Sequence, residues 1–207
     1  MIIAIDGPAA AGKGTIALKL AKHYGLNHLD TGLLYRAIGR LMTQQGLDLD
    51  DAAQAGEIAR KLKAKDLGHA DLRGREAGEL ASRVAVHPEV RAALVDFQRN
   101  FARTPPGAVL DGRDIGTAIC PEADIKIFVT ASPEVRARRR TDELNAKGRD
   151  VPYERILAEI LERDERDSHR SAAPLRQADD AVRLDTTALD AEAAFAAAIE
   201  IVDAGHE

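Results

Sequence analysis

The amino-acid sequence predicts an α/β fold in which helices cover both faces of a doubly wound parallel sheet. Short apolar segments alternate with longer segments of helical periodicity along the 207 residues, and parallel strands require such helical crossovers. The apolar segments also lack the polar alternation of half-exposed strands, which is typical of strands that are buried on both faces. The length favours a single compact domain.

Each element follows from a local pattern. The predicted strands are residues 2–5, 108–110, 125–129 and 181–184. A first helix ends at Gly25, and a second, capped by Asp30-Thr31-Gly32, ends at Gly46, because glycine terminates helices and small polar residues begin them. Further helices are predicted at about 51–65, 80–86, 88–101, 133–147, 153–168 and 189–204, and the polar, glycine-rich stretch 66–78 is predicted to be a loop.

Composition and charge exclude several classes of protein. With 45% hydrophobic and 30% charged residues, the chain can bury a core, and its longest apolar run, residues 193–199, is too short to span a membrane. The first residues lack the pattern of a secretory signal, so we expect a cytoplasmic protein. A net charge of −5 gives no general attraction for nucleic acid, and the single cysteine, Cys120, is expected to be a small buried hydrophobe.

A glycine-rich loop follows the first strand. Its spacing is G-x-x-x-x-G-K between a predicted strand and a predicted helix, the context in which this motif binds nucleotide phosphates. Backbone amides and the helix N-terminus would face the phosphates, and an exposed lysine would reach the outer ones. We expect nucleotide contacts from Gly7, Pro8, Ala9, Ala10, Ala11, Gly12, Lys13, Gly14 and Thr15. Gly14 stands where the motif has Ser or Thr, so the Thr15 hydroxyl is expected to contact phosphate rather than a metal.

Acidic residues follow two of the predicted strands. Asp111 ends the strand at 108–110, where an acid that helps to hold magnesium through water is found in such folds, although a turn or cap role is equally compatible. Asp6 is as well suited to bracing the glycine-rich loop by accepting backbone hydrogen bonds. We assign no direct metal ligand, and the six histidines show no metal-binding spacing; they are His23, His28, His69, His87, His169 and His206.

Three further blocks make the sequence resemble the bacterial cytidylate kinases over most of its length. They are LDTGLLYR, VLDGRDIGT and ERDERDSHRSAAPL, in this order after GPAAAGKGT. The loop alone indicates only the wider group of nucleoside monophosphate kinases; adenylate kinases have a different segment after Asp-Gly, and shikimate and gluconate kinases lack the three blocks. The resemblance implies ATP-dependent phosphorylation of CMP, and of dCMP, with ATP and Mg²⁺ bound.

The resemblance also implies roles for individual residues. Ser82, Arg91 and Asp114 would read cytosine, Arg163 and Asp167 the ribose, and Thr31, Arg36, Arg113 and Arg170 the acceptor phosphate, with Lys13, Arg113 and Arg170 as catalytic residues. An Asp carboxylate can accept from the exocyclic amine of cytosine, whereas uracil presents a carbonyl oxygen there. As an alternative, the helical spacing of Arg163, Asp167 and Arg170 fits a solvent-exposed, salt-bridged face.

The same resemblance divides the single domain, residues 1–207, into three parts. A core comprises about 1–50, 104–132 and 171–207, a monophosphate-binding segment about 51–103, and a lid about 133–170. The lid holds Arg136 and Arg138–Arg140, of which the latter three also fit an ordinary charged helix face. The family usually carries a small antiparallel sheet for which residues 66–78 are too few. We expect a monomer, and the rival interpretation is a nucleotide-binding switch without transfer activity.

Overall fold

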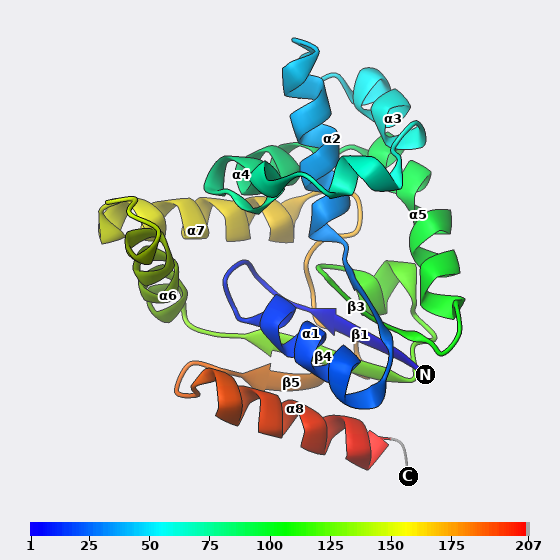
Figure 1. The fold of residues 1–207 in the computed structure, drawn as a ribbon, viewed down its shortest axis with the longest axis vertical. Coiled ribbons are helices and arrows are strands. Elements are labelled where there is room, and N and C mark those ends of the chain that lie inside the picture. Colours follow the sequence, from blue (N-terminus) through cyan, green and yellow to red (C-terminus); the bar gives the residue numbers. More distant parts are fainter. Residues whose placement is uncertain (206–207) are drawn as a thin grey trace.

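The sheet is parallel, as predicted, and it has five strands, one more than expected (Figure 1). The computed structural model describes residues 1–205. In this structure the sheet order is β2-β3-β1-β4-β5, and every neighbouring pair is parallel. The strands are β1 (Ile2–Asp6), β2 (Asn27–Asp30), β3 (Ala108–Gly112), β4 (Ile125–Thr130) and β5 (Val182–Asp185). All five strands therefore end on the same side of the sheet, its carboxyl edge, and ligands of doubly wound folds bind at this edge.

Helices cover both faces of this sheet. Ile3 and Ile5 of β1 belong to a core that includes α1 (Lys13–Tyr24) and α8 (Ala191–Gly205), whereas Ala4 belongs to a second core on the opposite face with α5 (Pro88–Arg103). Successive strand residues point to opposite faces, so both faces of β1 are apolar and buried. The sequence prediction of a doubly wound sheet is confirmed.

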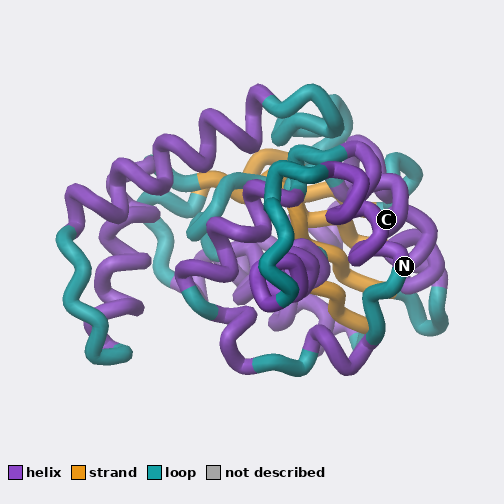
Figure 2. The backbone as a smooth tube through the Cα atoms, turned by 90° about the horizontal axis from the view of Figure 1, so that it is seen from above, coloured by secondary structure: helices purple, strands orange, loops and turns teal. Residues whose placement is uncertain are grey.

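Two helical groups stand beyond the carboxyl edge of the sheet (Figure 1). The first comprises α2 (Gly32–Gln44), α3 (Ala52–Arg60), α4 (Arg75–Val84) and the first half of α5, which share their own apolar core. The second is the pair α6 (Pro133–Ala146) and α7 (Tyr153–His169), with a small core of four buried residues. Figure 2 shows this pair projecting beyond the sheet. The two groups face each other across the edge where the strands end.

Several local predictions were wrong. β2 was missed because its residues, Asn-His-Leu-Asp, are mostly polar and it pairs with one strand only, β3. Residues 66–78 are not an open loop: short 3₁₀ helices occupy Ala64–Leu67 and Ala70–Arg73, and α4 already begins at Arg75. The helix predicted at 51–65 ends at Arg60. The Thr31 side chain does not cap α2; its hydroxyl donates to the Asp111 carbonyl at 2.8 Å.

Two other expectations concern the single cysteine and membrane-spanning helices. Cys120 is 2% exposed within the core that holds Ala4, and burial raises the pKa of its thiol to about 11, which confirms a buried, unreactive side chain. Within residues 1–205, no helix has the length and apolar character needed to cross a membrane.

Close packing of α2 on α4 allows a test of how the first helical group is held. A Cβ atom on Gly39 would lie 2.7 Å from the Leu80 Cβ and 3.2 Å from the Leu80 carbonyl oxygen, so a side chain at this position must push the helices apart. Gly39→Val should lower the free energy of unfolding by about 1–3 kcal/mol, as measured by urea denaturation. Gly68→Val is the matched control, because the nearest atom to its Cβ lies at 3.6 Å. Equal stabilities of the two variants would contradict this packing argument.

Candidate active site

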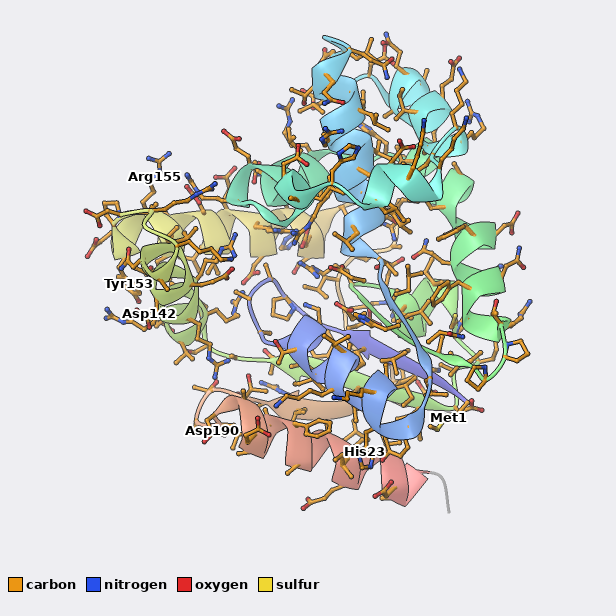
Figure 3. All side chains as sticks on the ribbon, in the orientation of Figure 1. Met1, His23, Asp142, Tyr153, Arg155 and Asp190 are labelled. Atoms are coloured by element: carbon orange, nitrogen blue, oxygen red, sulfur yellow. The ribbon has the colours of Figure 1, made fainter. Side chains whose placement is uncertain are left out.

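One cleft of about 940 Å³ runs along the carboxyl edge of the sheet. Its walls come from the glycine-rich loop, the ends of β2 and β3, and helices α4, α6 and α7. In Figure 3, Tyr153 and Arg155 mark the outer end of the α6–α7 pair, and Asp190 marks the chain just before α8. Nearly all of the sequence-predicted site residues line this cleft: Ala9–Thr15, Thr31, Arg36, Ser82, Arg91, Arg113, Asp114, Arg163, Asp167 and Arg170 do so, and Gly7 and Pro8 complete the loop that it follows.

The loop conformation depends on backbone angles that few residues adopt. Gly7 has φ of 145° and Gly12 has φ of 93°, in the region that favours glycine. A Cβ on Gly7 would also lie 1.9 Å from the Val129 carbonyl oxygen. No side chain caps the start of α1, which follows directly at Lys13, so the first amides of this helix are free to bind an anion.

Lys13 lies inside the cleft wall rather than in solvent. It is 5% exposed, and its Nζ donates to the Pro8 carbonyl at 2.7 Å. Burial, and then the nearby charge of Arg113, lowers the pKa of Lys13 well below its usual value. The expectation of an exposed lysine is therefore wrong. An anion beside Lys13 would reverse this effect, because an opposite charge favours the protonated amine.

Positive charge accumulates in the middle of the cleft. The Arg113 Nε donates to Asp167 at 2.9 Å, and the Arg163 Nε lies 3.8 Å from the same carboxylate, too far for a hydrogen bond. Burial, and then the Arg113 charge, lowers the pKa of Arg163 to about 10. The Nε atoms of Arg36 and Arg163 are buried and have no hydrogen-bond partner among the described residues. Unpaired donors of this kind are costly and fit the oxygen atoms of a bound phosphate.

A second charged cluster, around Asp114, also lines the cleft. Asp114 is buried; Arg91 donates to one of its oxygens, and the Arg170 Nη2 lies 3.5 Å from the other. Arg170 is only 8% exposed and Asp167 only 3%. The alternative of a solvent-exposed, salt-bridged face is therefore wrong. Ser82 donates to Asp167 at 3.3 Å rather than to Asp114, so the structure places it beside the arginine cluster.

Sequence reasoning missed His28, which lies on β2. Its Nε2 is 2.9 Å from the Asp111 Oδ1, so the imidazole orients this carboxylate at the end of β3. The contact could have been predicted if β2 had been recognised as a strand beside β3. In this register His28 pairs with Val109 and Asp30 with Asp111, so His28 and Asp111 lie on neighbouring strands two positions apart. The ring thus has a structural role, as expected for the histidines that the structure describes; His206 lies outside them.

The Asp6 carboxylate braces a different loop from the one expected. Its two oxygens accept from the backbone amides of Ile115 at 2.8 Å and Gly116 at 2.7 Å. These residues directly follow Arg113 and Asp114, so Asp6 fixes the segment that brings both side chains into the cleft. Burial raises the pKa of Asp6 to about 6, although the two amide hydrogen bonds act in the opposite direction.

The carboxylates of the cleft determine whether it suits magnesium. Among residues 1–205, no three His, Cys, Asp or Glu side chains form a metal-binding group. One carboxylate is well placed: the Asp111 Oδ2 would lie 3.9 Å from a Cβ on Gly14. Because Mg²⁺ commonly keeps several waters and binds one or two carboxylates together with substrate phosphates, Asp111 fits a magnesium ion that would arrive with a phosphate-bearing ligand.

Two further arginines of α6 hold neighbouring segments through hydrogen bonds. Arg139 donates to the carbonyls of Thr186 at 2.6 Å and Leu189 at 3.0 Å. Arg136 is 2% exposed and contacts Ala9 of the loop. In contrast, Arg138 lies 4.6 Å from the centre of the Tyr153 ring and is exposed. Of Arg138–Arg140, only Arg138 therefore fits an ordinary helix face; Arg139 and Arg140 line the cleft.

The fold and the loop define a P-loop α/β protein with a cleft suited to phosphate-bearing ligands. Comparison with known proteins is more specific. Residues 3–204 match the family model of cytidylate kinase, and the chain belongs to the cytidylate kinase family. A protein named cytidylate kinase from Methylocella silvestris is 61% identical over all of this chain and 96% of its own length. One of the same name from Xanthobacter autotrophicus is 63% identical over 99% of this chain and 98% of its own.

Solved structures support the fold alone. A gluconokinase from Sinorhizobium meliloti 1021 has a TM-score of 0.52 at 14% identity and covers 99% of this chain and 93% of its own. An uncharacterised protein from Eubacterium ventriosum has a TM-score of 0.56 at 17% identity, with 98% of each chain covered. Both similarities extend over nearly the whole chain, so the general fold is shared with solved structures.

The pKa of Asp6 predicts a specific pH dependence of stability. Burial raises this pKa from 3.8 to about 6, so the folded state favours the protonated acid. The stabilisation that protonated Asp6 contributes to the folded state is therefore fully present below pH 3.8, and it is lost as the pH rises through about 6. Wild-type unfolding free energy minus that of Asp6→Asn should therefore fall by at most about 3 kcal/mol between about pH 4 and 7. Urea denaturation across this range measures the difference; a flat or rising difference would contradict the prediction.

Proposed function

We propose that this protein transfers the γ-phosphoryl group of ATP to CMP, and to dCMP, with release of ADP. The observation that carries the proposal is a single cleft in which the phosphate loop and the Asp114 cluster are joined by the arginines around Asp167. Such a site can hold two nucleotides with their phosphates facing each other. Membership of the cytidylate kinase family supports the same reaction.

The donor would bind on the side of the phosphate loop. Gly7–Thr15 would surround its phosphates through backbone amides, and Lys13 would exchange its contact with the Pro8 carbonyl for a phosphate oxygen. Gly14 offers no hydroxyl, so Asp111 is the side chain that would hold Mg²⁺, through water. When bound, Mg²⁺ neutralises charge on the donor phosphates.

The acceptor would bind between α4 and α7. Arg36, Arg113 and Arg170, with Thr31 at the wall, would surround its phosphate, and the unpartnered Nε atom of Arg36 supports this role. Arg163 and Asp167 would contact the ribose. Asp114 would accept a hydrogen bond from the cytosine amine, with Arg91 and Ser82 near the base. Asp114 already has Arg91 and Arg170 as partners, so its charge is balanced in the buried site.

The reaction needs no general base, because the acceptor phosphate is already an anionic nucleophile. One of its oxygens forms the bond to the γ-phosphorus while the bond to the bridging oxygen of ADP breaks. The residues contribute position and charge: Lys13, Arg113 and Arg170 would balance the negative charge of the transferring group. Closure of α6 and α7 over the donor would keep water from the transferring group, which would protect ATP from hydrolysis.

The proposed division of labour follows the two helical groups. Residues of about 51–103 would serve as the monophosphate-binding segment and those of about 133–170 as a lid, with the rest forming the core. Both groups already line the cleft through α4 and α7. Because one chain supplies both halves of the site, we propose that it works as a monomer, and that it acts in the cytoplasm, where ATP is at hand.

An assay of ADP release with separate acceptors tests the proposal. CMP and dCMP should support turnover, whereas UMP, AMP and GMP should be poor acceptors. ATP binding without transfer to any of the five would instead favour a nucleotide-dependent switch. If no acceptor is phosphorylated, calorimetric titration with ADP shows whether the inactive protein still binds a nucleotide, as a switch must.

Lys13→Met should nearly abolish turnover without harming the fold. The methionine keeps the apolar stem, while the loss of a phosphate-binding cation should lower kcat by about 10³-fold. Stability should stay equal or rise, because the variant no longer buries a charge whose pKa is lowered by burial. Steady-state kinetics and thermal unfolding measure both effects, with exposed Lys22→Met on the same helix as control. Near-normal turnover would contradict the role of Lys13.

Asp114→Asn should change base choice more than overall rate. An asparagine can donate as well as accept, so the ratio of kcat/KM for CMP to that for UMP should fall toward one, from a ratio of up to about 10⁴. The ratio is the correct measure, because loss of the charge beside Arg91 and Arg170 affects both substrates. Asp96→Asn, on the exposed face of α5, is the control. An unchanged ratio would show that groups other than Asp114 select the base.

A further inference from the structure

Arg136, in the first turn of α6, lies behind the phosphate loop and does not line the main cleft. Four of its five N–H donors have partners. Nε donates to the Ala131 carbonyl at 2.9 Å, and Nη1 donates to the Ala9 carbonyl at 3.1 Å. Nη1 and Nη2 also bind the two oxygens of Asp164, at 3.0 and 2.5 Å. One buried guanidinium thus joins the phosphate loop, the end of β4 and α7.

The contact with Ala9 fixes the orientation of one peptide in the loop. In a trans peptide the carbonyl of Ala9 and the amide of Ala10 point in opposite directions. Arg136 and Pro8 line a separate cavity of about 460 Å³, whereas Ala9 and Ala10 line the main cleft. A carbonyl held by Arg136 therefore directs the Ala10 amide away from Arg136, toward the side on which the donor phosphates would bind.

Ala10 shows that this peptide needs to be held. Its φ of 60° lies in the left-handed region although it is not glycine, and such a residue relaxes unless its surroundings prevent it. Two contacts do so here: Arg136 binds the preceding carbonyl, and the Ala10 methyl packs on the small apolar core between α6 and α7. Both contacts come from the same helical pair.

We propose that Arg136 is a positioning residue for the phosphate loop: it holds the Ala9–Ala10 peptide with its amide toward the donor nucleotide, and Asp164 holds Arg136. The inference rests on the proposed function, because it assumes that the loop binds the phosphates of ATP. Because Asp164 lies on α7 and binds Arg136, this helix supports the donor loop. Arg163, the residue before Asp164, lines the main cleft, so a shift of α7 would alter both the loop and the cleft.

Kinetics of Arg136→Gln separate this role from a general structural one. Loss of a charged hydrogen bond to the loop should raise the KM for ATP about tenfold, while the KM for CMP should stay within about twofold. Asp164→Asn keeps the Arg136 contacts with Ala131 and Ala9 but weakens the support from α7, so it should raise the KM for ATP by less. Calorimetry with ADP should show the same order of affinities without turnover.

Arg138→Gln is the matched control, because Arg138 is an exposed arginine two positions along the same helix. It should leave both KM values unchanged. Equal increases of both KM values in Arg136→Gln, or an unchanged KM for ATP, would overturn the inference. If Arg136→Gln fails to fold, Asp164→Asn alone tests the inference. A rise in the KM for ATP without a rise in the KM for CMP would support it, and an unchanged KM for ATP would overturn it. An inactive wild-type protein would instead contradict the proposed function.

Discussion

One buried carboxylate, Asp167, holds the centre of the cleft together. It accepts from Arg113 and Ser82 and lies within ion-pair distance of Arg163, so it joins the end of β3, α4 and α7. Burial alone would raise the pKa of Asp167, but the charges of Arg113 and Arg163 outweigh burial and keep it below the usual value. A buried carboxylate without these cations would be strongly unfavourable. The two helical groups therefore meet through a charge balance rather than through a shared apolar core.

The parallel sheet makes this meeting possible. Its strands end at one edge, so Asp6, Asp30 and Asp111, which lie at the ends of β1, β2 and β3, come together there. The three carboxylates differ in their partners. Asp6 binds backbone amides, Asp111 contacts His28, and Asp30 lies beside Asp111, whose charge, after burial, raises the pKa of Asp30. The parallel register of the strands explains why the three carboxylates lie close together. Their burial explains why each carboxylate depends on its neighbours.

The sequence was sufficient for features that depend on local patterns. The strands at β1, β3 and β4 and the paired helices α6 and α7 follow from apolar runs and from punctuation by Gly and Pro. It failed where tertiary contacts decide: the polar β2 is a strand only because β3 pairs with it. The burial of Lys13 and Arg170 also depends on helices that are distant in sequence. From the sequence, Arg136 was predicted only to be a cation of the lid, because its partners in the phosphate loop and in α7 lie 127 and 28 positions away.

Charge in the cleft is balanced only partly by the protein itself. Burial lowers the pKa values of Lys13, Arg36 and Arg163, and the Nε donors of the two arginines are buried without a partner among the described residues. The folded chain therefore contains cations that a polyanion would satisfy better than the protein does. Bound phosphate groups should offset the free-energy cost of these buried cations, so that nucleotides stabilise the folded state more as they bind more tightly. The buried cations thus lower the stability of the protein without ligand and contribute to its affinity for phosphate. An apolar replacement of these cations that improved stability would lose the site.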